Sequence, residues 1–508
     1  MPTSPPASAP RCAVVDLGSN SVRLVVYEGR VRNPLAIFNE KAVLRLGSGL
    51  QSTGRLNPVA MEQAVRVLQR YRAVALAMGA NPPEVLATAA VREALNGPDF
   101  VALLSQRMPD VSIKVLSGPE EAAYAAEGVL CGIPDADGVM ADIGGGSLEL
   151  VALERGERGA AHTLGLGVIR LAERSGGDLA RARAIVEDEL AAVPWLAGMA
   201  GRDLYLVGGA WRALARIRME QVGYPLRMVH HYALAREEAR SFAIEIASMG
   251  RRELERLAVA PRRRIDDLPF AATVLRRLLR IALPRRVVFS ANGMREGWYM
   301  RRMPAALRAL DPLLAAGRHY ASWLGRDPAA PPALLEWTDP LFPLDSSAGR
   351  RLREAVCWMS DIGSRDHPEF RAEQAFLRVL RQPGIGLDHH VRAFLALAVA
   401  ARYEAPATAS YLAPARALLD AASARRAETI GVALRLAYTL SAGTPDLLAA
   451  TSLSVGGGRL TLVLDEDRGV FAGESVVRRL GRLAQLLGLE AAYEPADRAA
   501  LWPMRRVG

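Results

Sequence analysis

One glycine-punctuated segment occurs twice in this chain, and this repeat constrains the fold more than any other feature. When the sequence is shifted by 126 residues, so that Val14 lies on Met140, VVDLGSNSVRLVVYE aligns without a gap on MADIGGGSLELVALE. The copies share an Asp, a Gly, a Ser, a Leu-Val pair and a Glu at corresponding positions. In each copy an apolar strand, a sharp turn and a second strand follow one another, which predicts a β-hairpin. The repeat therefore predicts two similar α/β domains, each of which opens with such a hairpin.

Local patterns support this division of a chain that, at 508 residues, is too long for one hydrophobic core. After the first hairpin, helical periodicity runs from about 58 to 78, and strand-like segments lie at 85–88 and 112–116. Similar strands at 204–207 and 287–290 follow the second hairpin. Strands mixed with helices in this way indicate α/β layers.

The character of the sequence changes after Pro304. Residues from about 308 to 443 are rich in Ala, Leu and Arg at helical spacing, which predicts an all-α domain. The last part returns to mixed structure, with expected strands at 459–465 and 489–493 around a helix at 473–487. We therefore predict a disordered N-terminus at 1–11, α/β domains at 12–131 and 132–303, a helical domain at 304–443 and a small α+β segment at 444–508.

Charge and cysteine content narrow the functional classes. The formal net charge of +10 suits a polyanionic partner. However, almost all basic residues are Arg, a bias that genome base composition alone could produce. A basic binding surface and a surface charge that serves only solubility therefore both stay open. Three widely spaced cysteines indicate neither a disulfide framework nor a zinc site. Neither a secretion signal nor a run of about 18 uncharged apolar residues is present. We expect a cytoplasmic protein with neither a membrane nor a nucleic acid as partner.

The turn of the second hairpin has the composition of a phosphate-binding loop. Consecutive glycines without side chains let the backbone approach a ligand and turn its N–H groups toward phosphate oxygens. Asp142 precedes them at the strand end, where a hard carboxylate beside phosphate could hold Mg²⁺. A single turn of this kind is also an ordinary tight hairpin, but the duplicated Asp and Ser favour a binding function. The predicted phosphate-binding residues of this turn are Gly144, Gly145, Gly146 and Ser147.

The turn of the first hairpin offers hydroxyl, amide and backbone groups, so two facing loops could grip a phosphate chain from both sides. Two positions after the turn Ser, the copies differ in charge, with Arg23 in the first and Glu149 in the second. We expect Arg23 to contact phosphate and Glu149 to lie beside Asp142 on the metal side. The predicted phosphate-binding residues of the first turn are Asp16, Gly18, Ser19, Asn20 and Ser21.

Five segments in this order resemble the exopolyphosphatase and guanosine pentaphosphate phosphatase (Ppx/GppA) family. They are the first hairpin, ATAAVREALN, VLSGPEEAAYAAEGV, ADIGGGSLELV and FSANGMREG, and together they cover about residues 12 to 303. The resemblance implies two actin-like lobes of the ribonuclease H-like (ASKHA) class with an active site in the cleft between them. It also implies Mg²⁺-dependent hydrolysis of the terminal phosphate of a phosphate chain, and a homodimer.

The resemblance also assigns roles to residues that composition alone would place at the surface. Glu121, in the first turn of a helix that begins near Pro119, matches the family's catalytic carboxylate. A carboxylate with an ordinary pKa near 4.3 can deprotonate water without special tuning. Arg92 is the second predicted catalytic residue, because its guanidinium could bind phosphate and neutralise charge on the transferred group. Gly208 belongs to a small-residue turn near the site and is a predicted phosphate-binding residue. Arg212 and the adjacent tryptophan are expected to be surface and packing residues, and 290–297 is expected to have no catalytic role.

The helical domain resembles the HD phosphohydrolase domains that family members often carry. The segment before Gly363, together with His367, His389 and His390, carries this likeness, but Ser360 stands before Asp361 where an HD pair needs a histidine. A vestigial domain that shapes a substrate channel or a dimer interface is therefore favoured over a second metal site.

Several functions fit these motifs. We expect an exopolyphosphatase, because the C-terminal extension and the Arg-rich stretches at 261–264 and 275–286 could lengthen a basic track for inorganic polyphosphate. Solvated helix surface is the alternative interpretation of those stretches. Guanosine pentaphosphate is the alternative substrate. A sugar or acid kinase would need an acceptor pocket, for which no motif is present, and a non-catalytic sensor would have no need of Glu121 and Asp142.

Overall fold

The computed structural model describes residues 11–29, 31–257, 259, 262–383 and 386–496, which form two compact units, Met1–Ala309 and Leu310–Gly508. Most of the expected disordered N-terminus lies outside the described residues, and Arg11 forms an isolated bridge with Ala80. The boundary between the units falls six residues after the one expected at 303. Within the described residues, the helices are all too short or too polar to span a bilayer.

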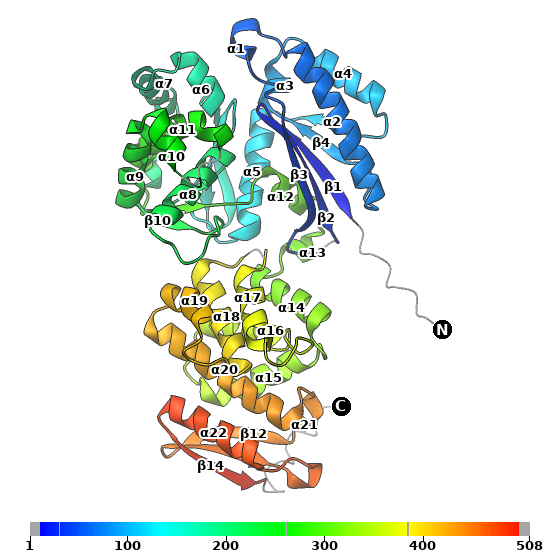
Figure 1. The fold of residues 1–508 in the computed structure, drawn as a ribbon, viewed down its shortest axis with the longest axis vertical. Helices are drawn as coiled ribbons and strands as arrows, with labels where there is room; N and C mark the ends of the chain where they lie inside the picture. Colours follow the sequence, from blue (N-terminus) through cyan, green and yellow to red (C-terminus); the bar gives the residue numbers. More distant parts are fainter. Residues whose placement is uncertain (1–10, 30, 258, 260–261, 384–385, 497–508) are drawn as a thin grey trace. The chain divides into compact units, whose positions relative to one another are not determined.

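The first unit contains two α/β lobes built on sheets of similar topology (Figure 1). In lobe I the strand order is β3-β2-β1-β4-β5, in which β1 and β2 are antiparallel and β4 and β5 run parallel to β1. Its strands are β1 (Cys12–Leu17), β2 (Ser21–Glu28), β3 (Leu35–Val43), β4 (Glu84–Ala87) and β5 (Ile113–Val115), and its helices are α1 (Leu50–Thr53), α2 (Pro58–Ala77), α3 (Ala89–Glu93) and α4 (Gly97–Arg107).

In lobe II the order is β10-β11-β9-β6-β7-β8, and β9 and β11 run parallel to β6. The strands are β6 (Gly138–Ile143), β7 (Leu148–Glu154), β8 (Glu157–Leu164), β9 (Asp203–Val207), β10 (Ala233–Ala235) and β11 (Arg286–Phe289). The helices are α6 (Val168–Ser175), α7 (Leu179–Ala191), α8 (Gly209–Gln221), α9 (Arg236–Ser248), α10 (Arg251–Arg256), α11 (Leu268–Ala282), α12 (Met294–Arg301) and α13 (Ala305–Arg308). The duplicated hairpins are β1-β2 and β6-β7, so the internal repeat is a repeat of structure.

Helix α5 (Gly118–Gly132) joins the lobes and packs on the sheet of lobe II, although the sequence places it in the first domain. Its buried face contacts Met140, Val151 and Tyr205 of that sheet. It also crosses α12 at very short range, since a Cβ on Gly128 would lie 1.9 Å from the carbonyl oxygen of Gly293. Only glycine permits this approach of α5 to the start of α12.

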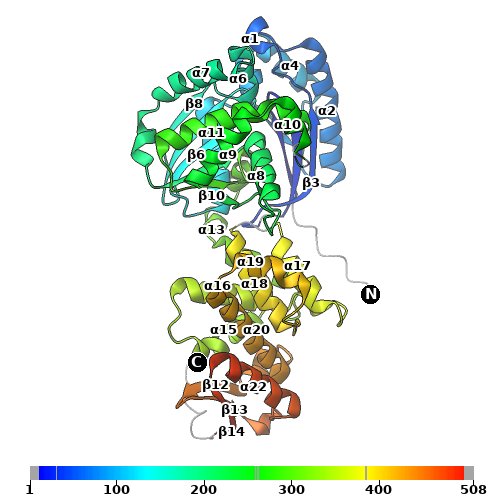
Figure 2. The ribbon, with the colours of Figure 1, turned by 60° about the vertical axis from the view of Figure 1, so that its left-hand side comes forward.

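The second unit combines helices with a small sheet (Figure 2). Its helices are α14 (Pro312–Leu324), α15 (Ala330–Thr338), α16 (Ser347–Met359), α17 (Arg371–Arg381), α18 (His389–Arg402), α19 (Ala413–Leu418), α20 (Ala421–Ser441), α21 (Pro445–Leu448) and α22 (Glu474–Leu487). The strands β12 (Thr451–Gly456), β13 (Arg459–Leu464) and β14 (Glu490–Pro495) form one sheet. Because α22 packs against α20, the segment after 444 belongs to the same compact unit as the helices.

Candidate active site

The turns of the two duplicated hairpins have the same backbone bond. The amide of Gly18 donates to the carbonyl oxygen of Ser21 at 3.1 Å, and the amide of Gly144 donates to that of Ser147 at 3.0 Å. The turns also face each other closely, because a Cβ on Gly146 would lie 3.1 Å from Ser19 Oγ. The sequence signals thus meet in space, one turn on each lobe.

A cavity of about 160 Å³ lies between these turns. Of the predicted residues, all but Arg92 line it, and they come from both hairpins and from the starts of α5 and α8. These lining residues are Asp16, Gly18, Ser19, Asn20, Ser21, Arg23, Glu121, Asp142, Gly144, Gly145, Gly146, Ser147, Glu149 and Gly208. Gly208 has φ 116°, and a Cβ there would lie 2.4 Å from the carbonyl oxygen of Ile143, so the turn before α8 requires glycine.

The charge difference between the copies lies at one cross-strand position. In lobe I Asp16 is directly opposite Arg23, and in lobe II Asp142 is directly opposite Glu149. Opposite residues of an antiparallel pair project from the same face with Cβ atoms about 5 Å apart, and like charges there are destabilising. The second hairpin therefore carries two adjacent carboxylates without the internal cation that the first hairpin has.

The protonation of these carboxylates reflects their burial. Desolvation raises the pKa of Asp142 to about 6, with Arg212 lowering it and Asp16 raising it further. Desolvation, with the charges of Glu121 and Asp142, also raises the pKa of Glu149. Glu149 is 2% exposed, and its Oε1 is buried without a hydrogen-bond partner among the described residues.

This donor set fits a divalent cation. Mg²⁺ is commonly held by one or two carboxylates together with substrate phosphates, and a cation beside Asp142 and Glu149 would offset both their repulsion and the unpaired oxygen. Within the described ranges, groups of three or more His, Cys, Asp or Glu with metal-binding geometry are absent. The residues present therefore suit a cation completed by water and phosphate oxygens.

The two adjacent glutamates at the start of α5 have different surroundings. Ser117 and Glu120 form a capping box, and Glu120 also pairs with Lys114 at 2.8 Å, so its carboxylate is used in the structure of lobe I. Glu121 instead lines the cavity with its side chain 14% exposed. Burial raises its pKa to about 7, although Arg92 lowers it, so the ordinary value expected from the sequence is wrong.

Arg92 does not line the cavity, although the sequence predicts contact with phosphate. Its Nη1 donates to the carbonyl oxygen of Leu116 at 2.7 Å and to Glu121 Oε2 at 3.0 Å. The Arg92 side chain therefore holds the carboxylate of Glu121, the predicted base, without lining the cavity itself. This placement favours a positioning role over direct phosphate contact.

Several cavity residues are missing from the sequence prediction. Arg212 lies in the cavity, not at the surface, where it lowers the pKa of Asp142, and Arg295 of the segment 290–297 lies 4.0 Å from Asp16. Arg295 belongs to one of the five family segments, but the place of both arginines in the cavity depends on how α8 and α12 pack. Arg264 of the predicted basic stretch also lines the cavity, and the other missed lining side chains with polar groups are Lys41 and Thr88.

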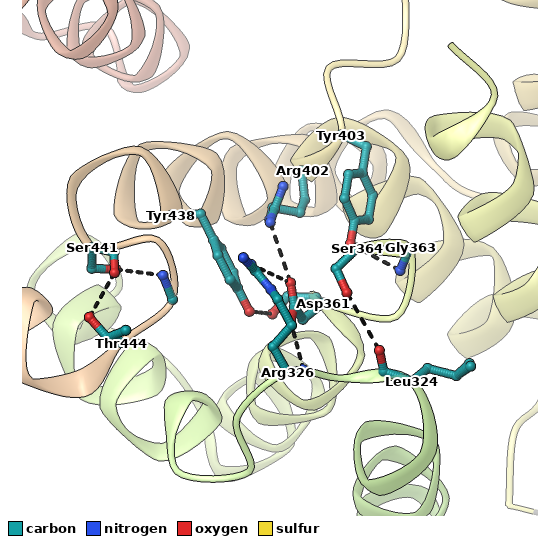
Figure 3. A network of polar contacts seen from close by, with 12 residues as sticks. Leu324, Arg326, Asp361, Gly363, Ser364, Arg402, Tyr403, Tyr438, Ser441 and Thr444 are labelled. Carbon is teal, nitrogen blue, oxygen red and sulfur yellow. Dashed lines mark hydrogen bonds and ion pairs between the residues drawn. The ribbon is translucent and has the colours of Figure 1, made fainter. Parts of the chain in front are cut away.

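The helical unit places an ion-pair network around Asp361 (Figure 3). Arg326 donates to both of its carboxylate oxygens at 2.8 and 2.9 Å, and Arg402 Nη2 lies 3.8 Å away. The Arg402 guanidinium also lies over the rings of Tyr438 and Tyr403, at 3.8 and 4.4 Å from their centroids. Two guanidinium groups thus surround the aspartate that the HD resemblance singles out.

Comparison with known proteins decides the family. A model described as the Ppx/GppA phosphatase family matches residues 25–306, more than half of the chain. The chain belongs to this family. A second model, described as "Exopolyphosphatase, C-terminal", matches residues 313–493.

Curated relatives of this Ppx/GppA chain have different names. "Exopolyphosphatase 2" of Mycobacterium tuberculosis is 33% identical over 174 residues, which cover 32% of this chain and 54% of the relative. "Guanosine-5'-triphosphate,3'-diphosphate pyrophosphatase" of Aeromonas salmonicida is 26% identical, with 57% of this chain and 59% of the relative covered. The chain thus spans a little over half the length of these two relatives.

Solved structures show the fold. An exopolyphosphatase from Cytophaga hutchinsonii superposes with a TM-score of 0.52 at 21% identity, over 56% of this chain and 96% of that one. An exopolyphosphatase-like protein gives 0.51 at 23% identity, over 57% and 97%. These likenesses support the α/β fold expected from the sequence for the first unit.

Proposed function

We propose that this chain is a Mg²⁺-dependent exopolyphosphatase that removes the terminal phosphate from inorganic polyphosphate. One observation carries the proposal: the carboxylate of Glu121, only 14% exposed, lines a cavity between two hairpin turns whose backbone and hydroxyl groups can bind phosphate. Family membership supports the reaction class. The names of the curated relatives include both an exopolyphosphatase and a guanosine nucleotide pyrophosphatase, so the choice of substrate rests on the cavity.

The proposed reaction is in-line attack of water on the terminal phosphorus. Glu121 orients the water and accepts its proton, and a pKa of about 7 suits a general base at neutral pH. The new P–O bond forms as the anhydride P–O bond breaks, and the remaining chain leaves with a negative charge on its oxygen. Backbone N–H groups of both turns and the hydroxyls of Ser19 and Ser147 hold the phosphate oxygens. Mg²⁺ held by Asp142 and Glu149 would supply charge neutralisation.

The lining of the cavity favours polyphosphate over a nucleotide. Basic side chains line it on several sides, and the described lining residues include no aromatic side chain on which a guanine could stack. Each unit of a bare phosphate chain carries negative charge that can pair with a basic side chain. A nucleoside in the same space is uncharged and would leave some of these side chains without an anion. The basic lining side chains are Arg23, Lys41, Arg212, Arg264 and Arg295.

Only part of the Arg-rich sequence contributes to this basic lining. Arg264 of the first stretch lines the cavity. In the second stretch Arg276 and Arg280 are exposed positions of α11 and do not line it. The basic track proposed here therefore extends from the cavity through Arg264, not along α11.

Phosphate release by the purified chain tests the proposal. Long-chain polyphosphate, guanosine pentaphosphate and ATP are compared at equal phosphate concentration with Mg²⁺. We expect release chiefly from polyphosphate, with a preference for long chains that weakens as salt rises. Release chiefly from the guanosine nucleotide would keep the reaction and reassign the substrate, and binding without release would favour the sensor. A homodimer and a cytoplasmic location remain predictions, the first of which light scattering tests.

A further inference from the structure

The second unit contains a cavity of about 230 Å³ whose floor and rim differ in character. The floor is aliphatic and includes Leu397 of α18, Leu412 beside α19 and Val432 of α20, all of which are at most 5% exposed. Leu486 of α22 continues it. The rim carries four arginines and two glutamates, which are Arg416, Arg435, Arg479, Arg482, Glu404 and Glu428.

Most of the rim is held in place by internal ion pairs. Glu404 binds Arg435 Nη2 at 2.7 Å and Arg479 Nε at 3.1 Å, and Glu428 binds Arg416 Nη2 at 3.0 Å. Because two carboxylates face four guanidinium groups, the rim keeps an excess of positive charge. A guanidinium held by a carboxylate on one edge still presents its other N–H groups, so these pairs orient donors toward the cavity.

Two donors of the rim are not used by the described part of the protein. Nε of Arg435 is buried and has no hydrogen-bond partner there. Arg482, on the exposed side of α22, lines the cavity and forms none of the ion pairs found among the described residues. The guanidinium of Arg482 is therefore the rim group that an anion in the cavity could bind without displacing a carboxylate.

The backbone at Glu404 supports a function for its side chain. It follows the end of α18 with φ 59°, and the next amide donates back to the carbonyl oxygen of Ala400 at 3.0 Å. Glycine is the usual residue at this left-handed position. A glutamate in this backbone conformation is less stable than a glycine would be. Its carboxylate, however, binds the two rim arginines.

We propose that this cavity binds an organic phosphate, with the phosphate on the arginine rim and the apolar body on the aliphatic floor. Guanidinium groups bind phosphate through paired N–H donors, which favours this anion over a monovalent one. The aliphatic floor is of no use to a bare inorganic anion, and it favours a ligand with an apolar part such as a nucleoside. The inference is independent of the reaction in the first unit.

Calorimetry with the full chain tests this site. The probes are the non-hydrolysable nucleotide adenosine 5′-(β,γ-imido)triphosphate and its inorganic counterpart, imidodiphosphate. We expect the nucleotide to bind in the second unit, and more weakly in the first cavity, which favours a bare phosphate chain. Binding in the second unit should be at least tenfold weaker for imidodiphosphate, because that probe leaves the floor empty.

Charge reversal at the rim identifies the site. Arg482→Glu should weaken nucleotide binding in the second unit at least tenfold. Arg478→Glu, one turn earlier on the same exposed side of α22 and outside the cavity, should leave this binding unchanged. Both positions are exposed, so neither change should unfold the chain. Nucleotide binding that neither variant weakens, or that both variants weaken equally, would overturn the site. Equal affinity for the two probes would overturn the organic ligand.

Discussion

Arg92 Nη1 lies 3.0 Å from Glu121 Oε2, although only the glutamate lines the cavity. The same nitrogen donates to the carbonyl oxygen of Leu116, so the arginine ties the start of α5 to the end of the strand before it. Through this contact the arginine fixes both the position and the charge of the proposed base.

The first prediction concerns this positioning. Arg92→Met should lower kcat about 10- to 100-fold with little change in KM, because a displaced base loses alignment while the phosphate groups stay bound. Arg92→Lys should recover part of the loss by keeping a cation beside Glu121. Steady-state kinetics with polyphosphate measure both. A rise in KM alone would instead indicate direct substrate contact by Arg92.

The second prediction separates the adjacent glutamates. Glu121→Gln should lower kcat by about 10²- to 10⁴-fold, the range typical of a removed general base, and keep substrate binding. Glu120→Gln is the matched control, because Glu120 pairs with Lys114 at 2.8 Å and does not line the cavity. It should retain nearly full turnover. Full turnover of the Glu121 variant would refute its assignment as the base.

The third prediction concerns the cation. Without Mg²⁺, Glu149→Gln should raise the melting temperature, because it removes the buried carboxylate that lies opposite Asp142. A gain of 1 kcal/mol corresponds to about 2–4 °C in a domain of 150–250 residues. Added Mg²⁺ should stabilise the wild-type chain and not this variant. Glu154→Gln, at the exposed end of β7, should behave as wild type. Equal stabilisation of all three by Mg²⁺ would exclude the site.

The fourth prediction concerns acid stability. Asp203 is 1% exposed at its side chain and pairs with Arg285 at 2.6 Å and Arg286 at 3.0 Å. Burial alone would raise its pKa, but these two arginines hold it below the ordinary value. The folded state therefore binds its proton less readily than the unfolded state. This stabilisation is present above about pH 4, the unfolded pKa, and is lost as the pH falls through the folded pKa.

Denaturant unfolding of Asp203→Asn tests this linkage. The variant should be about 1–3 kcal/mol less stable than wild type at pH 7, as expected for charged hydrogen bonds lost at a buried group. The difference should shrink toward pH 3. A difference that is independent of pH would show that packing, not charge, holds β9 to β11.

The fifth prediction concerns the network around Asp361. Asp361→Ala would leave the Arg402 guanidinium, in a residue 3% exposed, without its carboxylate. Loss of one partner of a buried pair typically costs 3–5 kcal/mol, so unfolding of the second unit should shift strongly. The exposed Asp446→Ala should have little effect. Stabilisation by Mg²⁺ should survive in Asp361→Ala. Its disappearance there would indicate a cation site in the helical unit.

Much of the first unit could be predicted because its signals are local. The hairpin turns, the glycines and the capping sequence before Glu121 act over a few residues, and the repeat places the two hairpins in equivalent positions. By contrast, β3 and β8 are edge strands with largely exposed or half-buried side chains, so their hydrophobic alternation is too weak to identify. The positions of Arg212 and Arg295 depend on how α8 and α12 pack, which no local pattern contains. The pKa of Glu121 likewise depends on burial that only the tertiary structure produces.

The first hairpin has Arg23 where the second has Glu149, so the two hairpins present different charges to the cavity. The backbones of the copies share one turn geometry, yet one hairpin presents Asp opposite Arg and the other presents Asp opposite Glu. Fixed charges of this kind set up a field in a low-dielectric cavity. A phosphate beside the first hairpin thus meets a cation, whereas a phosphate beside the second hairpin meets two carboxylates until a bound cation screens them. A nearly symmetric scaffold thereby distinguishes the two sides of a substrate that is itself a uniform polymer.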